Sequence, residues 1–155
     1  MAKLFRKILC PIDFEENSMA ALDFAVQLAR ENEATLCLMH VVFVPLVRPG
    51  YPLEPAAVSS DEPPKAELEE LARKRIHGEV PHEVVVKVGQ PAEAILRAAE
   101  ELNPDLIVMA THGRRGMVRF FLGSVAERVV RESTRPVLTI RPTTAGADDA
   151  PGKAS

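Results

Sequence analysis

The stretch Asp105-Leu-Ile-Val-Met-Ala110 decides the fold class, because it is a continuous apolar run of a length typical of strands. It shows no alternation of apolar and polar residues, which indicates a strand buried on both faces of a sheet. Asn103 and Pro104 end the segment before it, and a glycine-containing segment follows it. A strand covered on both faces needs helices above and below, so this run predicts the α/β class.

The same alternation of strand and helix extends outward from this run. Short apolar or β-branched runs predict four more strands, over residues 7–12, 35–42, 83–88 and 136–140. Apolar residues three and four apart predict the intervening helices, which begin at Asn17 or Ser18, at Lys65, at Pro91 and at Ser124. Together these elements predict an open parallel five-stranded sheet with helices on both faces.

The chain length of 155 residues fits one domain, which we place over residues 1–142. Residues 45–64 contain six prolines without periodicity and predict a long loop, and the small polar residues 143–155 predict a flexible tail.

The net charge of −3 leaves no basic excess for nucleic acid. No apolar run suits a signal peptide or a membrane span, so we expect a cytoplasmic protein without a membrane partner. Cys10 and Cys37 lie in apolar runs and are interpreted as small buried side chains.

Ligands of open parallel sheets bind beyond the carboxyl ends of strands, where the strand order reverses. That rule directs attention to Asp13, to Val41 and to the segment after Ala110. Residues 111–116 contain two glycines, which a loop around phosphates requires. Ser124 with Glu127 three residues later indicates a capping box, a phosphate site at the same helix N-terminus, or both.

Several motifs in register resemble the universal stress protein family, and its ATP-binding branch in particular. That branch carries G-x-x-G, nine residues, then G-[ST]; here Ala110-Thr-His-Gly113, residues 114–122 and Gly123-Ser124 fill the frame. The similarity also includes Ile8–Asp13, His40-Val41, Gly89–Glu93 and Pro136–Ile140, and covers residues 3–142. It implies an adenine-nucleotide alpha-hydrolase-like, Rossmann-like sheet with strand order 3-2-1-4-5.

The resemblance also implies a role for individual residues. Pro11, Ile12, Asp13 and Val41 would form the adenosine end of an ATP site, with the Asp13 carboxylate at the ribose hydroxyls. Phosphates would contact Gly113, Arg114, Gly116, Gly123, Ser124 and Val125, mainly through backbone N–H groups. Ala110 stands where the motif has its first glycine, and its methyl group is harmless if Ala110 ends its strand in an ordinary conformation.

The family resemblance further implies Mg²⁺ held by ATP phosphates and waters, and a homodimer formed through the strand Pro136–Arg141. We expect a stress-response protein that binds ATP with little or no turnover and acts on an unknown regulatory partner protein. Two alternatives stay open. One is a slow ATPase or phosphotransferase using Asp13, His112 or Arg114. The other is a nucleotide-free interaction or chaperone-like module, which Ala110 alone supports.

Overall fold

A computed structural model describes residues 3–43, 49–50, 63–111 and 123–141. Strands and helices alternate along these residues. The strands are β1 (Lys7–Pro11), β2 (Thr35–Phe43), β3 (His82–Gly89), β4 (Leu106–Ala110) and β5 (Val137–Ile140). The helices are α1 (Glu16–Asn32), α2 (Pro63–Ile76), α3 (Pro91–Leu102) and α4 (Ser124–Glu132).

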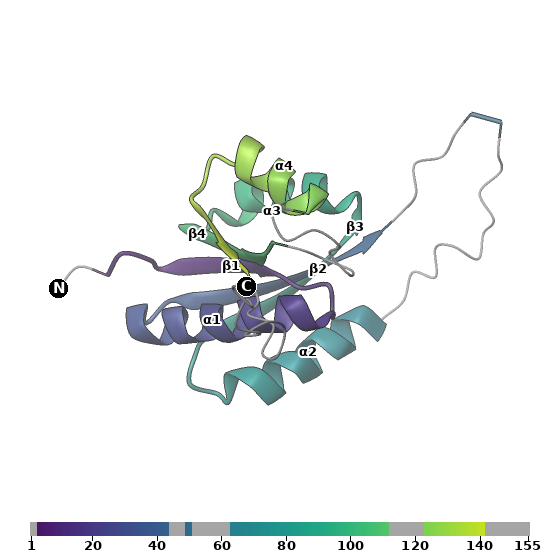
Figure 1. Ribbon diagram of the computed structural model, residues 1–155. Coiled ribbons are helices and arrows are strands. Elements are labelled where there is room, and N and C mark those ends of the chain that lie inside the picture. The colour runs from purple at the N-terminus through teal and green to yellow at the C-terminus, as the bar shows by residue number, and fades with distance from the viewer. Residues whose placement is uncertain (1–2, 44–48, 51–62, 112–122, 142–155) are drawn as a thin grey trace, which may run out of the picture.

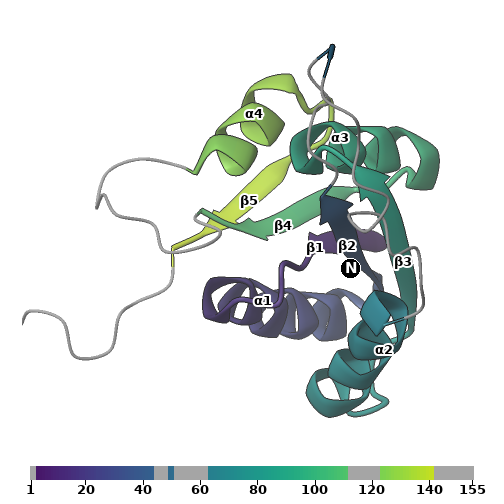
Figure 2. The same cartoon turned by 90° about the vertical axis from the view of Figure 1, so that its right-hand side faces the viewer.

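The five strands form one parallel sheet in the order β3-β2-β1-β4-β5, which confirms the expected fold class and strand order. Figures 1 and 2 show α1 and α2 on one face of the sheet and α3 and α4 on the other. Two buried clusters correspond to these faces. Ile8 and Cys10 pack with α1 and α2, whereas Leu9 and Cys37 pack with α3 and α4. The apolar runs lack alternation because both of their faces are covered.

Two expected helix caps are wrong. The N-cap of α1 is Glu15 rather than Asn17 or Ser18, and Ser18 is buried inside the helix. At α4 the N-cap is Gly123, so Ser124 and Glu127 stand one position too late for a capping box. In both places the backbone turn precedes the serine, and a favourable side chain does not by itself fix where a helix begins.

Other boundaries shift by one or two residues. The strand expected from Asp105 begins at Leu106, because the Asp105 carboxylate instead accepts hydrogen bonds from the N–H groups of Arg6 and Lys7 at 2.7 and 3.0 Å. The helix expected from Lys65 begins at Pro63, where a missing N–H costs nothing. Residues 63 and 64 of the expected loop are therefore helical; most of that loop and the tail 143–155 lie outside the described residues.

Both cysteines are free and fully buried, as expected, and they lie on opposite faces of the sheet. Burial raises the pKa of the Cys10 thiol. Burial, reinforced by the charge of Glu83, raises the pKa of Cys37 from 9.0 to about 11. Within the described residues, no helix has the length and apolar character needed to cross a bilayer.

The raised thiol pKa values predict a loss of stability at alkaline pH. The folded protein holds the Cys37 proton more tightly than the unfolded chain, so unfolding releases protons between pH 9.0 and about 11. The free energy of unfolding should fall as pH rises through this window, measured by urea titration at each pH. In Cys37→Ala the free energy of unfolding should fall less steeply with pH. Equal slopes in the native protein and the variant would contradict the raised pKa of Cys37.

Candidate functional site

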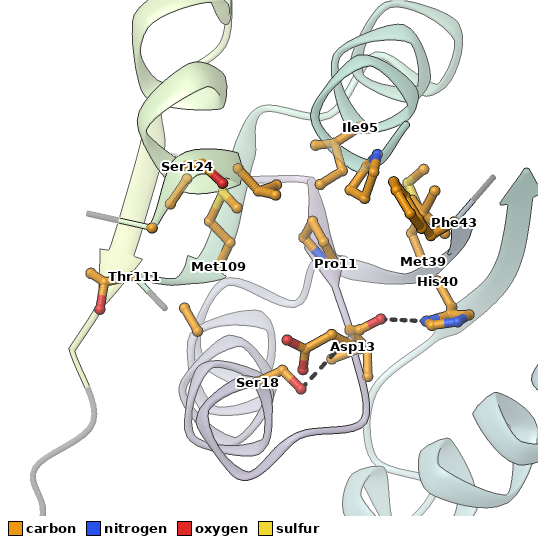
Figure 3. Close-up of a pocket in the computed structure, with 17 residues that line it drawn as sticks. Pro11, Asp13, Ser18, Met39, His40, Phe43, Ile95, Met109, Thr111 and Ser124 are labelled. Carbon is orange, nitrogen blue, oxygen red and sulfur yellow. Dashed lines mark hydrogen bonds between the residues drawn. The ribbon is translucent and has the colours of Figure 1, made fainter. Parts of the chain in front are cut away.

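The carboxyl ends of β1, β2 and β4 open onto one cavity of about 510 Å³, a volume typical of small-molecule sites. β1 lies between β2 and β4, so the cavity sits where the strand order reverses, as parallel sheets favour. Figure 3 shows Thr111 and Ser124 on one side of Pro11, and His40 and Phe43 on the other. The cavity therefore spans the ends of three strands and the start of α4.

The structure brings together eight of the eleven residues that the sequence suggested. Those lining the cavity are Pro11, Ile12, Asp13, Val41, Ala110, Gly123, Ser124 and Val125. The other three, Gly113, Arg114 and Gly116, lie outside the described residues, as does His112. The eight come from segments separated by more than half of the chain, and no local sequence pattern alone would place them side by side.

The N-terminus of α4 forms one wall of the cavity. Gly123, Ser124, Val125 and Ala126 all line it. The Gly123 N–H donates to the Thr111 carbonyl at 2.5 Å, and the Thr111 N–H donates to the Ile140 carbonyl at 3.0 Å. These bonds hold the helix start against the ends of β4 and β5. The first-turn N–H groups of a helix have no partner within it, and with the helix dipole they favour an anion.

The turn between β1 and α1 holds Asp13 at the cavity. The Ile12 N–H donates to the Met39 carbonyl at 2.7 Å, which extends the β1–β2 pairing by one residue. The Glu15 N–H donates to Asp13 Oδ1 at 2.9 Å, and the Asp13 N–H donates to Ser18 Oγ at 3.4 Å. The carboxylate is exposed and accepts hydrogen bonds only, so it suits the hydroxyl groups of a ligand.

An apolar wall of the cavity was missed by the sequence analysis. Met39 and Phe43 extend from the same face of β2 as Val41, and Pro91 and Ile95 come from the start of α3. Residues two apart on a strand share a face, so the placement of Val41 was a signal for its two neighbours. Ser18, His40, Met109, Thr111 and Ala126 complete the described lining and were also missed.

Ala110 ends its strand in an ordinary backbone conformation, the condition under which its methyl group was expected to be harmless. It is the last residue of β4 and pairs with Ile140. It is not among the described residues with positive φ, so its backbone is one that any residue adopts. The methyl group causes no backbone strain at this position.

The model of the universal stress protein family matches residues 4–141 of the chain. The chain belongs to the universal stress protein family. Among its relatives, universal stress protein MJ0531 of Methanocaldococcus jannaschii is 36% identical over 149 residues, which cover 89% of this chain and 83% of that protein. Universal stress protein YxiE of Bacillus subtilis is 32% identical over 148 residues, covering 89% and 100%.

Solved universal stress proteins share the fold. UspA from Lactobacillus plantarum is 25% identical with a TM-score of 0.74, covering 88% of this chain and 97% of that one. A universal stress protein in complex with cAMP is 24% identical, with a TM-score of 0.66 over 88% and 97%. A family protein from Arabidopsis thaliana with AMP bound is 20% identical, with a TM-score of 0.65 over 94% and 97%. At these last two identities the likeness shows the fold alone.

Proposed function

We propose that this universal stress protein binds ATP in the cavity at the ends of β1, β2 and β4. The observation that carries the proposal is the convergence of Asp13, Val41 and the α4 N-terminus on one cavity. These groups supply an acceptor for hydroxyls, a strand end beside an apolar wall, and N–H donors for an anion. A nucleoside phosphate has all three complementary parts in one molecule.

The base and ribose belong at the β1–β2 side of the cavity. Met39, Phe43, Pro91 and Ile95 offer apolar surface for a planar base, and the Val41 backbone offers hydrogen bonds to its edge. Asp13 lies between this wall and α4 (Figure 3), which supports assigning its carboxylate to the ribose hydroxyls.

The phosphates belong at the N-terminus of α4, beside Ser124 and Val125. Gly113, Arg114 and Gly116 would complete this end from the segment that follows β4. Among the described residues no three His, Cys, Asp or Glu side chains are grouped to hold a metal ion. Mg²⁺ would accordingly be held by phosphate oxygens and waters, as is usual for nucleotide-bound magnesium.

We place this protein among regulators that bind nucleotide with little or no turnover. Among the described lining residues Asp13 is the single carboxylate, and it lies at the proposed ribose position rather than beside the phosphates. Two proteins of the same fold carry cAMP and AMP, which supports the proposal of an adenine-nucleotide site. Phosphate release should stay at background under conditions that saturate binding.

The proposal includes a cytoplasmic homodimer that acts on a regulatory partner protein. β5 is an edge strand of the sheet, and all four of its residues are partly exposed. An edge strand offers unpaired backbone groups to a second strand, so residues 136–141 are the proposed contact. Analytical ultracentrifugation of the native protein should give twice the monomer mass. Thr139→Pro removes a backbone N–H from this edge strand and should give the monomer mass.

Thermal unfolding with and without Mg-ATP tests the nucleotide proposal. Nucleotide at a hundredfold over Kd adds about 2.7 kcal/mol to the free energy of unfolding, so we expect the Tm to rise by about 5–10 °C. Gly123→Trp should abolish the rise: the Gly123 backbone, φ −58° and ψ 154°, suits any residue, and the indole would fill the cavity. No rise for the native chain, with no nucleotide in a denatured extract, would refute the proposal.

Ala110→Gly, which restores the first glycine of the family motif, is expected to change the Kd for Mg-ATP by less than about threefold. The backbone is already an ordinary strand, so removing the methyl group relieves no strain. The glycine should instead lower the free energy of unfolding by about 0.5–1 kcal/mol, through the added freedom of the unfolded chain. A tenfold or greater gain in affinity would show that the methyl group obstructs the ligand.

A further inference from the structure

We propose that His40 is the positioning residue of the candidate site: it fixes the backbone on both sides of Asp13 and so holds the carboxylate in place. His40 lies on β2 and lines the cavity. Its ring reaches across to the turn that follows β1, as the dashed line in Figure 3 shows. The effect on ligand binding rests on the proposed function, because the ligand is ATP. The restraint of the turn by His40 does not require a ligand.

The first contact is a hydrogen bond to the residue before Asp13. His40 Nδ1 lies 2.7 Å from the Ile12 carbonyl oxygen. A carbonyl oxygen only accepts, so Nδ1 carries a proton and donates it. β1 ends at Pro11, and the Ile12 carbonyl therefore finds its partner in a side chain. Ile12 itself is buried, where an unpaired carbonyl would be costly.

The second contact is to the residue after Asp13. The rings of Phe14 and His40 have centroids 4.7 Å apart and planes inclined by 51°. Phe14 has φ of 64°, in the left-handed region that a bulky side chain adopts only at a cost in free energy. Packing of its ring against His40 and the α1–α2 core offsets that cost. One imidazole thus restrains residues 12 and 14, with Asp13 between them.

The position of Asp13 depends on this restraint because its other bonds are local. Its Oδ1 accepts from the Glu15 N–H, and its own N–H donates to Ser18 Oγ. The first bond lies inside the turn and the second joins the turn to α1, and neither ties the turn to the strand across the cavity. His40 and the Ile12–Met39 backbone bond provide that tie.

Two substitutions at His40 test the two contacts. His40→Leu removes both the donor and the aromatic ring, whereas the side-chain amide of His40→Asn puts an N–H close to the place of Nδ1 and removes only the ring. His82→Leu is the matched control: His82 also lies on a strand, with Nδ1 3.3 Å from the Val80 carbonyl, but it is exposed and does not line the cavity.

The first readout is amide hydrogen exchange of the nucleotide-free protein. In His40→Leu the Asp13 and Glu15 amides should exchange about tenfold faster, the loss expected for one hydrogen bond, with Val108 in β4 unchanged. His40→Asn keeps the donor and lacks the ring, so it should restore part of the slow exchange, and His82→Leu should match the native chain. Unchanged exchange in His40→Leu would overturn the proposal. Equally fast exchange in both His40 variants would overturn the role of the hydrogen bond and assign the restraint to the ring.

The second readout is the Kd for Mg-ATP by calorimetry. His40→Leu should bind about tenfold more weakly, and His40→Asn should recover to within about threefold of the native value. If the native chain binds ATP and His40→Leu binds equally well, this inference fails and the proposed function stands. If the native chain binds no ATP, the proposed function fails, and the exchange experiment still decides whether His40 holds the turn.

A third measurement covers the case in which His40→Leu does not fold. Nitrogen-15 signals of the native imidazole show which ring nitrogen carries the proton, and an unconstrained neutral ring carries it mainly on Nε2. The geometry requires Nδ1–H for His40. A neutral ring with an unprotonated Nδ1 would refute the bond and the proposal with it.

Discussion

Ser124→Asp is expected to weaken the binding of Mg-ATP about 100-fold while leaving the fold intact. Ser124 is the first residue of α4, is exposed and lines the cavity. A carboxylate in the first turn of a helix favours the helix dipole, so the free energy of unfolding should stay equal or rise slightly. The same carboxylate would face the proposed phosphates. Two like charges about 6 Å apart at an effective dielectric constant of about 20 repel by about 2.8 kcal/mol, which is about 100-fold in Kd.

The matched control is Ala66→Asp. Ala66 is an exposed residue in the first turn of α2, which covers the opposite face of the sheet from α4. Ala66→Asp adds the same charge as Ser124→Asp, also in the first turn of a helix but away from the cavity. It should leave the Kd for Mg-ATP within about twofold of the native value. Calorimetric titration of the three proteins checks the result. Equal affinities in Ser124→Asp and the native chain would place the phosphates elsewhere.

Leu9→Ala should produce the largest loss of stability, about 2–5 kcal/mol in the free energy of unfolding. Leu9 lies on β1, the central strand, with none of its surface exposed, and packs among residues of β2, β4, α3 and α4. The shortened side chain leaves a cavity between the sheet and two helices. Urea titration measures the loss, with an unchanged m value showing that the unfolding reaction is the same.

Leu4→Ala makes the same chemical change at a residue that is 76% exposed. Its effect should stay within about 0.5 kcal/mol, because no buried contact is lost. A loss of less than about 1 kcal/mol in Leu9→Ala would show that the layer under α3 and α4 is not packed as described.

The sequence was sufficient for the elements of the fold and insufficient for their exact starts. Runs such as Leu106–Ala110 need only buried apolar residues, so a strand is evident from composition and length. The order of the strands came from the family resemblance, since an apolar run does not specify its neighbours. Helix starts at Glu16 and Ser124 depend on backbone turns, and the serines expected as caps lie beyond those turns.

The candidate site shows the same division. The rule that parallel sheets bind ligands at their carboxyl ends was enough to single out Asp13 and the Ala110–Ser124 segment. Asp13 and the described residues at both ends of that segment line one cavity. His40 and Phe43 were not assigned, because contacts across a turn or a strand face are tertiary. A polar ring inside the apolar run of β2 was nevertheless a signal, since a buried polar group needs a partner.

A nuclear magnetic resonance titration with Mg-ATP tests whether ATP binds in this cavity. We expect saturable shifts of the backbone amides around the cavity, in residues 12–13, at Val41 and Thr111, and in residues 123–126, with no change at His82 on the opposite end of the sheet. Shifts confined to residues outside the cavity, or no shifts at millimolar nucleotide, would contradict the claim that this cavity binds ATP.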